Sequence, residues 1–148
     1  MDVRLEANEM RAWTAFLECG ERVRSSVERQ LRLDGGLTQV EYEVLARLSE
    51  SIAPLTMSEL AERMICSKSG LTYTIDKMSK RGLVGRTVDA KDRRSFLLLL
   101  TPSGRALLEQ IAPGHIVAVK EAFSDGLADD EVDVLAGLLE RIAGRLRP

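Results

Sequence analysis

The chain has 148 residues, 45% of them hydrophobic and 30% charged, with two cysteines and a formal net charge of −2 at pH 7. This composition is typical of one ordinary folded domain and excludes intrinsic disorder, and two cysteines without metal-ligand spacing exclude a disulfide framework and a cysteine metal site. The first residues lack the apolar run of a signal peptide, and the longest apolar run, at residues 96–100, is too short to cross a membrane, so we expect a protein of the reducing cytoplasm with no membrane partner.

The first predicted element is a long amphipathic helix over residues 6–33. Its apolar side chains recur at three- and four-residue steps and form one stripe: Trp13, Phe16, Leu17, Gly20, Val23, Val27 and Leu31. Such a helix is roughly 40 Å long at 1.5 Å per residue, which exceeds the span of a compact small domain. We therefore expect part of the stripe to need a partner from outside, and residues 34–36 to end the helix.

Two capping boxes predict the starts of the next two helices. In each, a threonine hydroxyl accepts a hydrogen bond from a free helix amide, and a glutamate three residues later reaches back to the threonine amide. Thr38 and Glu41 begin the first of these helices. Thr56 and Glu59 begin a shorter one, which is expected to end near Cys66.

A further short helix follows across a tight turn, and the pair predicts a helix-turn-helix. Ser67 is expected to cap this second helix, which would run to about Arg81. Gly82 suits the position just after its carboxyl end, because glycine adopts the left-handed conformation that ends helices. Leu71, Ile75 and Met78 are its expected buried residues.

A β-hairpin and two helices complete the chain. Residues 83–88 and 95–100 are the expected strands, joined by a polar loop rich in turn formers. Thr101 and the proline after it begin a long helix, which Pro113 is expected to kink or interrupt, and a last helix begins near Asp129. The order predicts a mainly α fold with a small β-hairpin wing, that is, a winged helix-turn-helix with additional helices.

The distribution of charge points to a polyanionic partner. Residues 54–105 hold ten Lys and Arg against five Asp and Glu, a net charge of +5, whereas the rest of the chain holds eleven against eighteen, a net charge of −7. Double-stranded DNA is a dense line of negative charge, and its major groove admits one α-helix. On charge alone, a chance cluster on a solvated surface explains the pattern equally well; the helix-turn-helix and the hairpin favour DNA.

The second helix of the pair and the hairpin tip supply the candidate DNA contacts. Small, polar or cationic side chains gather at and near the start of that helix: Ser67, Lys68, Ser69, Thr72, Tyr73 and Lys77. Lys91, Arg93 and Arg94 at the hairpin tip suit the negative potential of a narrow minor groove. Asp92 would repel phosphate, so we expect it to support an arginine or the turn, and we expect Asp76 to hold Arg93 or Arg94 in place.

Several motifs between residues 56 and 105 occur together in one known family. They lie at residues 56–61, 71–72, 75–78, 81–84, 86, 89–94 and 100–105. The most specific is the Asp-Arg-Arg of the hairpin tip, followed by a strand, a threonine and a Gly-Arg pair. In these motifs the chain resembles the MarR family of winged helix-turn-helix regulators of transcription, and the general plan of that family covers nearly the whole chain.

The resemblance implies a homodimer that binds a pseudo-palindromic operator. Residues 1–36 and 104–148 would form a helical dimerisation region with the partner, and residues 37–103 the DNA-binding domain. Arg86 joins the candidate DNA contacts, and Arg94 would enter the minor groove. Arg93 would be largely structural and close enough to contact a phosphate. Many family members are repressors released by small phenolic or apolar anions. The family often has arginine where this chain has Tyr73, so no base preference is carried over.

An effector site and a redox site are the remaining candidates. Trp13, Phe16, Tyr42 and His115 are candidates to line a cleft for a small aromatic or apolar anion between the dimer helices and the DNA-binding lobe, although such aromatic residues more often belong to the core. A redox-sensing regulator would use Cys19 or Cys66, the latter because a helix amino terminus can depress its thiol pKa. Burial as small apolar residues is the alternative for both cysteines.

Other classes of function are less consistent with the sequence. No nucleophile, base and orienting group stand together, and only one histidine is present, so we expect no enzyme, no catalytic residue, no metal and no cofactor. A winged-helix protein-interaction module without DNA binding is a further hypothesis. Tyr73 is compatible with such an interface, whereas the basic segment argues against it.

Overall fold

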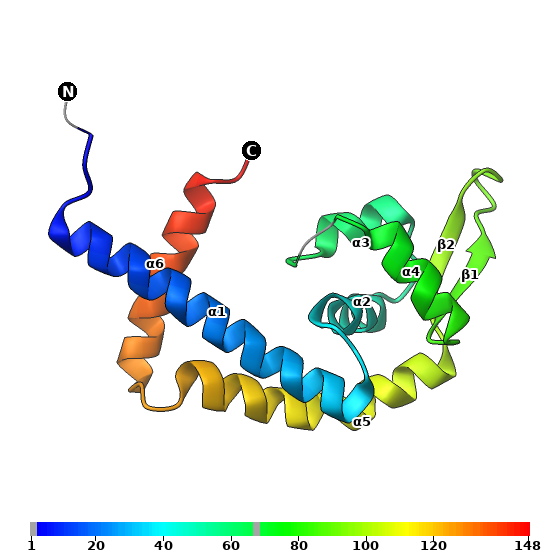
Figure 1. Ribbon diagram of the computed structural model, residues 1–148. Coiled ribbons are helices and arrows are strands. Elements are labelled where there is room, and N and C mark those ends of the chain that lie inside the picture. The colour runs from blue at the N-terminus through cyan, green and yellow to red at the C-terminus, as the bar shows by residue number, and fades with distance from the viewer. Residues whose placement is uncertain (1–2, 67–68) are drawn as a thin grey trace.

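The computed structural model describes residues 3–66 and 69–148, and it confirms the mainly α fold with a β-hairpin wing. The elements in chain order are α1 (Ala7–Gly35), α2 (Gln39–Glu50), α3 (Met57–Arg63), α4 (Leu71–Lys80), β1 (Val84–Val88), β2 (Phe96–Leu100), α5 (Pro102–Val119), the π-helical segment η1 (Lys120–Ser124) and α6 (Asp129–Arg145). Figure 1 shows two groups of elements: α2, α3, α4 and the hairpin at one end, and α6 crossing the amino-terminal part of α1 at the other. The carboxyl end of α1 and helix α5 join them.

Both predicted capping boxes are confirmed. The Thr38 hydroxyl accepts a hydrogen bond from the amide of Glu41 at 3.1 Å, and the Glu41 carboxylate accepts one from the amide of Thr38 at 2.9 Å. Thr56 and Glu59 make the same two bonds at 3.1 and 2.8 Å. These local signals therefore fix the starts of α2 and α3.

One prediction about a helix limit is wrong. Helix α4 begins at Leu71 after Gly70, which has a φ of 73°, so the chain turns in the left-handed conformation available to glycine instead of entering the helix at Ser67. Ser67 itself lies outside the described residues. Of the two outcomes predicted for Pro113, a kink or an interruption, the structure shows the milder one: helix α5 continues through Pro113, and its ribbon bends in the middle. Pro113 is exposed, so water can satisfy the carbonyl that its missing amide leaves free.

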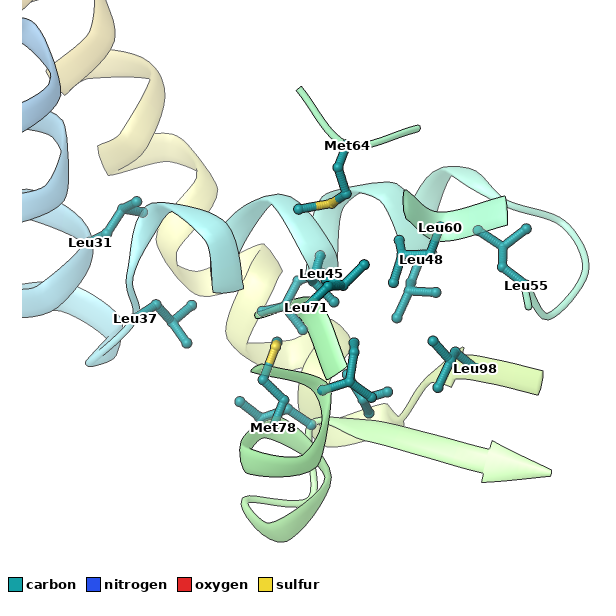
Figure 2. Close-up of a cluster of buried hydrophobic side chains, with 14 of the residues drawn as sticks. Leu31, Leu37, Leu45, Leu48, Leu55, Leu60, Met64, Leu71, Met78 and Leu98 are labelled. Carbon is teal, nitrogen blue, oxygen red and sulfur yellow. The ribbon is translucent and has the colours of Figure 1, made fainter. Parts of the chain in front are cut away.

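The core of the winged helix-turn-helix gathers around α2. Figure 2 shows Leu45 and Leu48 of α2 in one cluster with side chains from α3, α4 and β2, including Leu60, Leu71 and Leu98. Leu45, Leu60 and Leu98 have no solvent exposure. Leu55 pairs with Leu98 through two backbone hydrogen bonds of 2.9 and 2.7 Å, so the loop before α3 extends the hairpin.

The base of the hairpin rests directly on the start of α5. The strands pair antiparallel, with Val84 opposite Leu100. The Thr101 hydroxyl donates to the carbonyl of Gly82 at 2.6 Å and accepts from the amide of Gly104 at 3.0 Å. A Cβ added at Gly104 would lie 2.2 Å from the carbonyl oxygen of Leu83, so the backbones approach too closely for any side chain.

Part of the apolar stripe of α1 has no cover within the chain, as the sequence predicts. Val27 and Leu31 are buried, whereas the preceding part of the helix is exposed. Helix α6 has no buried residue at all. We call the exposed apolar side chains of these helices, of the end of α5 and of η1 the apolar outer face: Met10, Trp13, Phe16, Leu17, Ile116, Val117, Phe123, Val134, Leu138 and Ile142. Within residues 3–66 and 69–148, no helix combines the length and apolar content that a membrane span requires.

A buried carboxylate holds the turn between α3 and α4. Glu43 of α2 accepts hydrogen bonds from the backbone amides of Ile65 and Cys66, the second at 2.8 Å, and lies 3.6 Å from the Arg47 guanidinium. Burial of Glu43 favours its neutral form, but the hydrogen bonds from the Cys66 thiol and the two amides outweigh it, and the pKa of Glu43 is lower than its ordinary value. The ionised carboxylate therefore stabilises the turn.

This arrangement predicts a stability that depends on Glu43 and on pH. A lowered folded-state pKa means that the contribution is complete above the unfolded value, about 4.3, and is lost as pH falls through the folded pKa. Glu43→Gln is expected to lower the free energy of unfolding at pH 7 by about 1.5–3 kcal/mol, the range for hydrogen bonds to charged groups. Below pH 4 the difference should shrink. Urea unfolding from pH 3 to 7 measures the free energy of unfolding and its pH dependence, and Glu62→Gln, at an exposed position, serves as control. A loss of stability in Glu43→Gln that is equal at every pH would contradict the role of the ionised Glu43 carboxylate.

Candidate DNA interface

Helix α4 divides into a buried face and an exposed face. Leu71, Ile75 and Met78 are buried against the core, as the sequence predicts. Thr72 and Tyr73 are exposed at the amino-terminal end, Tyr73 to 72%. Ser69 is exposed in the turn before the helix, and the predicted contacts Ser67 and Lys68 lie outside the described residues. Polar groups thus gather where a groove-reading helix would meet base edges.

Lys77, the last predicted contact on α4, has an ionic partner within the chain. Its Nζ lies 3.5 Å from Oε1 of Glu41 on α2. The Glu41 side chain is almost fully buried, whereas that of Lys77 is 52% exposed. Lys77 therefore adds positive charge at the rim of α4 beside Glu41, and a DNA contact by Lys77 stays a prediction.

The hairpin tip is shaped by two aspartate turns. Oδ1 of Asp89 accepts a hydrogen bond from the amide of Lys91 at 2.9 Å, and Oδ1 of Asp92 accepts one from the amide of Arg94 at 3.0 Å. The prediction that Asp92 supports the turn is confirmed. Lys91, Arg93 and Arg94 are all exposed, so the tip presents three cations on a short loop that projects beyond the part of the hairpin packed against α4.

Asp76 has a different partner from the predicted one. It accepts a hydrogen bond from the guanidinium of Arg86 on β1 and does not hold Arg93 or Arg94. The Arg86 guanidinium also lies 4.7 Å from the centre of the Phe96 ring on β2. The reason is position: Arg86 lies on the body of the strand that packs against α4, whereas Arg93 and Arg94 lie at the distant tip. Asp76 and Arg86 therefore brace the hairpin against the helix, and a DNA contact by Arg86 stays a prediction.

The candidate effector residues form two separate pairs. Trp13 and Phe16 stack at 5.9 Å in the exposed part of α1, and Tyr42 of α2 meets His115 of α5 at 4.1 Å between ring centres. Within one chain these pairs are separated along α1 by roughly 25 Å, at 1.5 Å per residue from Trp13 to Gln30 beside α5. A single cleft lined by all four residues is therefore not formed by one chain.

The Tyr42–His115 pair is the more enclosed of the two. Among the described residues, Nδ1 of His115 and Oε1 of Gln30 are buried without a hydrogen-bond partner. Burial lowers the pKa of His115 and raises that of Tyr42, so both side chains are neutral at pH 7. Buried polar atoms without partners are rare in proteins, and they make this junction of α1, α2 and α5 a candidate ligand site.

Cys66 does not have the properties of a redox sensor. Burial and the neighbouring Glu43 carboxylate raise the pKa of its thiol to about 11. The predicted depression by a helix amino terminus is wrong, because α4 begins only at Leu71 and a negative charge lies closer. Cys19 is exposed on α1. No group of three His, Cys, Asp or Glu side chains within residues 3–66 and 69–148 is arranged to hold a metal ion.

Sequence reasoning missed Glu43 and the partners of Glu41 and Arg81. The capping role of Glu41 is a local pattern, but its proximity to Lys77 and Arg81 depends on how α2 and α4 pack. The Arg81 guanidinium donates to the carbonyls of Gly35 and Gly36 at the end of α1, contacts that join residues about 45 positions apart. No signal in the sequence indicates these contacts.

The fold and the motifs match known proteins along the whole chain. A model of the MarR family matches residues 37–96. YkoM of Bacillus subtilis (strain 168), an uncharacterized HTH-type transcriptional regulator, is 32% identical over 144 residues, which cover 94% of this chain and 92% of YkoM. YetL of the same strain, an HTH-type transcriptional repressor, is 35% identical over 112 residues, which cover 73% of this chain and 67% of YetL.

Solved structures agree. Sco3205 of Streptomyces coelicolor, a MarR family transcriptional regulator crystallised in complex with DNA, matches with a TM-score of 0.92 and 31% identity over 99% of this chain and 93% of Sco3205. CouR of Rhodococcus jostii RHA1, crystallised with p-coumaroyl-CoA, matches with a TM-score of 0.73 and 26% identity over 95% of this chain and 96% of CouR. The chain therefore belongs to the MarR family of transcriptional regulators.

Proposed function

We propose that the protein is a homodimeric, sequence-specific DNA-binding repressor of transcription that a small molecule releases from its operator. The observation that carries this proposal is that the hairpin whose tip bears three exposed cations packs with its first strand against α4, whose amino-terminal side chains are exposed and polar, and that this lobe lies at the opposite end of the molecule from α6. The DNA complex of Sco3205 and the repressor YetL support it.

Each subunit would use α4 and the hairpin for different grooves. Helix α4 enters the major groove, where Ser69, Thr72 and Tyr73 meet base edges or backbone and the amino-terminal amides of the helix favour a phosphate. Ser67 and Lys68 belong to the same proposed contact region. Arg94 enters the adjacent minor groove, whose negative potential attracts arginine, while Lys91 and Arg93 lie near phosphates.

The two-fold arrangement follows from the apolar outer face. Two copies that cover this face on each other would form a dimerisation region from residues 1–36 and 104–148, leaving residues 37–103 as the DNA-binding domain. The two copies of α4 would then lie in successive major grooves roughly 34 Å apart, which matches a pseudo-palindromic operator.

A charge in the apolar outer face is expected to separate the subunits. Leu138→Lys places an ammonium among apolar side chains of α6, where burial of an unpaired charge is costly. Sedimentation velocity should show a monomer where the wild type is a dimer. Glu140→Gln changes the charge by the same amount on the other side of α6 and should leave the dimer intact. A dimeric Leu138→Lys protein would contradict this interface.

Removal of the wing arginine is expected to weaken DNA binding without unfolding the protein. Arg94→Ala should cost about 1–3 kcal/mol per half-site, because each wing loses one groove contact. The measurement is fluorescence anisotropy with an operator selected from a random duplex pool, at several salt concentrations. Arg141→Ala on α6 removes the same charge far from the hairpin tip and serves as control, provided that sedimentation velocity shows the variant to keep the wild-type association state, because α6 belongs to the proposed dimerisation region. Equal affinities of wild type and Arg94→Ala would remove the wing from the proposal.

The effector site is proposed at the Tyr42–His115 junction. A small aromatic carboxylate is proposed as the ligand because two aromatic rings supply apolar contact, an N–H at His115 Nδ1 can donate to a carboxylate, and Gln30 Oε1 can accept from a ligand hydroxyl. The p-coumaroyl-CoA complex of CouR supports a ligand of this class. A ligand between α1, α2 and α5 would act where the two groups of elements join.

Anion binding at this site is expected to take up a proton. The lowered pKa of His115 keeps the free imidazole neutral at pH 7, and an adjacent carboxylate would favour the charged form and raise that pKa. The affinity for p-coumarate, used as probe, should therefore increase as pH falls from 8 to 6. Calorimetry in buffers of different ionisation enthalpy measures the proton uptake, and His115→Asn should abolish it. A pH-independent affinity would contradict the role of His115.

A further inference from the structure

Three helix ends meet at one point between the two groups of elements. Helix α1 ends at Gly35, α2 begins with the capping box of Thr38 and Glu41, and α4 ends with Arg81 as its cap residue. The last carbonyls of a helix have no partner within the helix and need one from elsewhere. At the end of α1, that partner is a side chain from the end of α4.

Arg81 connects all three ends. Its Nη1 donates to the carbonyl of Gly36 at 3.1 Å and its Nη2 to the carbonyl of Gly35 at 3.3 Å. Nη1 also lies 3.9 Å from Oε2 of Glu41. A guanidinium is planar and carries five N–H donors in fixed directions, so it can hold several acceptors in one geometry, which a lysine ammonium cannot do equally well.

The acceptors themselves are fixed. The Glu41 side chain is 4% exposed, and its Oε2 accepts a hydrogen bond from the amide of Thr38 at 2.9 Å. At Gly35, α1 packs so closely against α5 that an added Cβ would lie 3.2 Å from Cγ2 of Ile111. Arg81 therefore joins α4 to a rigid corner formed by the other helices.

A small rotation of α4 about Arg81 would move the opposite end of the helix, which matters for the proposed DNA-binding function, on which the inference rests. The end of α4 that would read DNA is the amino-terminal one, roughly 15 Å from Arg81 for a helix of this length. A rotation of about 10° at Arg81 moves that end by about 3 Å, close to the rise of about 3.4 Å per base pair along one strand. The direction of α4 must hence be held firmly if two copies are to meet two half-sites.

We propose that Arg81 is a positioning residue that sets the direction of α4 relative to the dimerisation helix α1, and thereby the separation of the two DNA-reading helices. It acts through the carbonyls of α1 and the Glu41 carboxylate and need not touch DNA. Its loss should leave the fold in place but broaden the range of α4 orientations and relax the preference for one operator spacing.

The first experiment needs no DNA. Spin labels at Ser26→Cys on α1 and Thr72→Cys on α4, in the Cys19→Ser protein and diluted with unlabelled protein, report the distance within one chain. Cys66 can stay, because the raised pKa of its thiol, about 11, disfavours labelling. Arg81→Gln should broaden the distance distribution, Arg81→Lys should give an intermediate width, and the exposed neighbour Lys80→Gln should match the wild type. An Arg81→Gln distribution as narrow as that of Lys80→Gln overturns the proposal.

The second experiment tests the consequence on DNA. Affinities are measured for an operator selected by the wild type and for the same operator with one base pair inserted between half-sites. The preference for the selected spacing should fall about 2- to 30-fold in Arg81→Gln, the range of coupling effects measured for network residues. An equal loss of affinity for both spacings would assign Arg81 to phosphate contact and overturn the positioning role. If no variant, including the wild type, binds any duplex, the proposed function fails while the spin-label result stands independently.

Discussion

The cost of apolar surface in water governs how this molecule is organised. Each Å² of apolar surface removed from water contributes roughly 25 cal/mol of favourable free energy. The apolar residues of the chain are gathered in two separate areas. One area is the core around α2, where Leu45, Leu60 and Leu98 have no exposure. The other is the apolar outer face, which one chain leaves open although it includes the chain's only tryptophan. The second area is the observation on which the proposed homodimer depends.

Helix α2 also holds α4, the proposed DNA-reading helix, at both ends through two buried carboxylates. Glu43 accepts hydrogen bonds from two backbone amides of the turn before α4, and Glu41 lies beside Lys77 and Arg81 at the carboxyl end of α4. Buried charges are tolerated when each is hydrogen-bonded or paired, and both are. A helix held at its two ends by polar contacts keeps its direction even when its exposed face is replaced by different side chains. Exposed residues such as Tyr73 can therefore be replaced without refolding the lobe.

Local patterns were predictable from the sequence, and contacts across the fold were not. The capping boxes, the hairpin and the Asp92 turn depend on residues a few positions apart, so their chemistry is visible in the sequence. The sequence predicts a start of α4 at Ser67 because serine is a good helix cap. In the structure, the left-handed backbone of Gly70 places the start at Leu71. The partner of Asp76 and the pKa of Cys66 depend on side chains brought together by packing, and no periodicity encodes them.

The close approach at Gly104 limits how this protein can diverge. Any side chain there would collide with the Leu83 carbonyl, so mutation at the root of the hairpin would displace the whole wing at once. The tip is under no such restriction, because residues 90–94 are exposed and their turn depends mainly on aspartate side chains. The anchored root therefore sets where the wing leaves the body of the lobe, so the side chains at the tip are always presented from the same base.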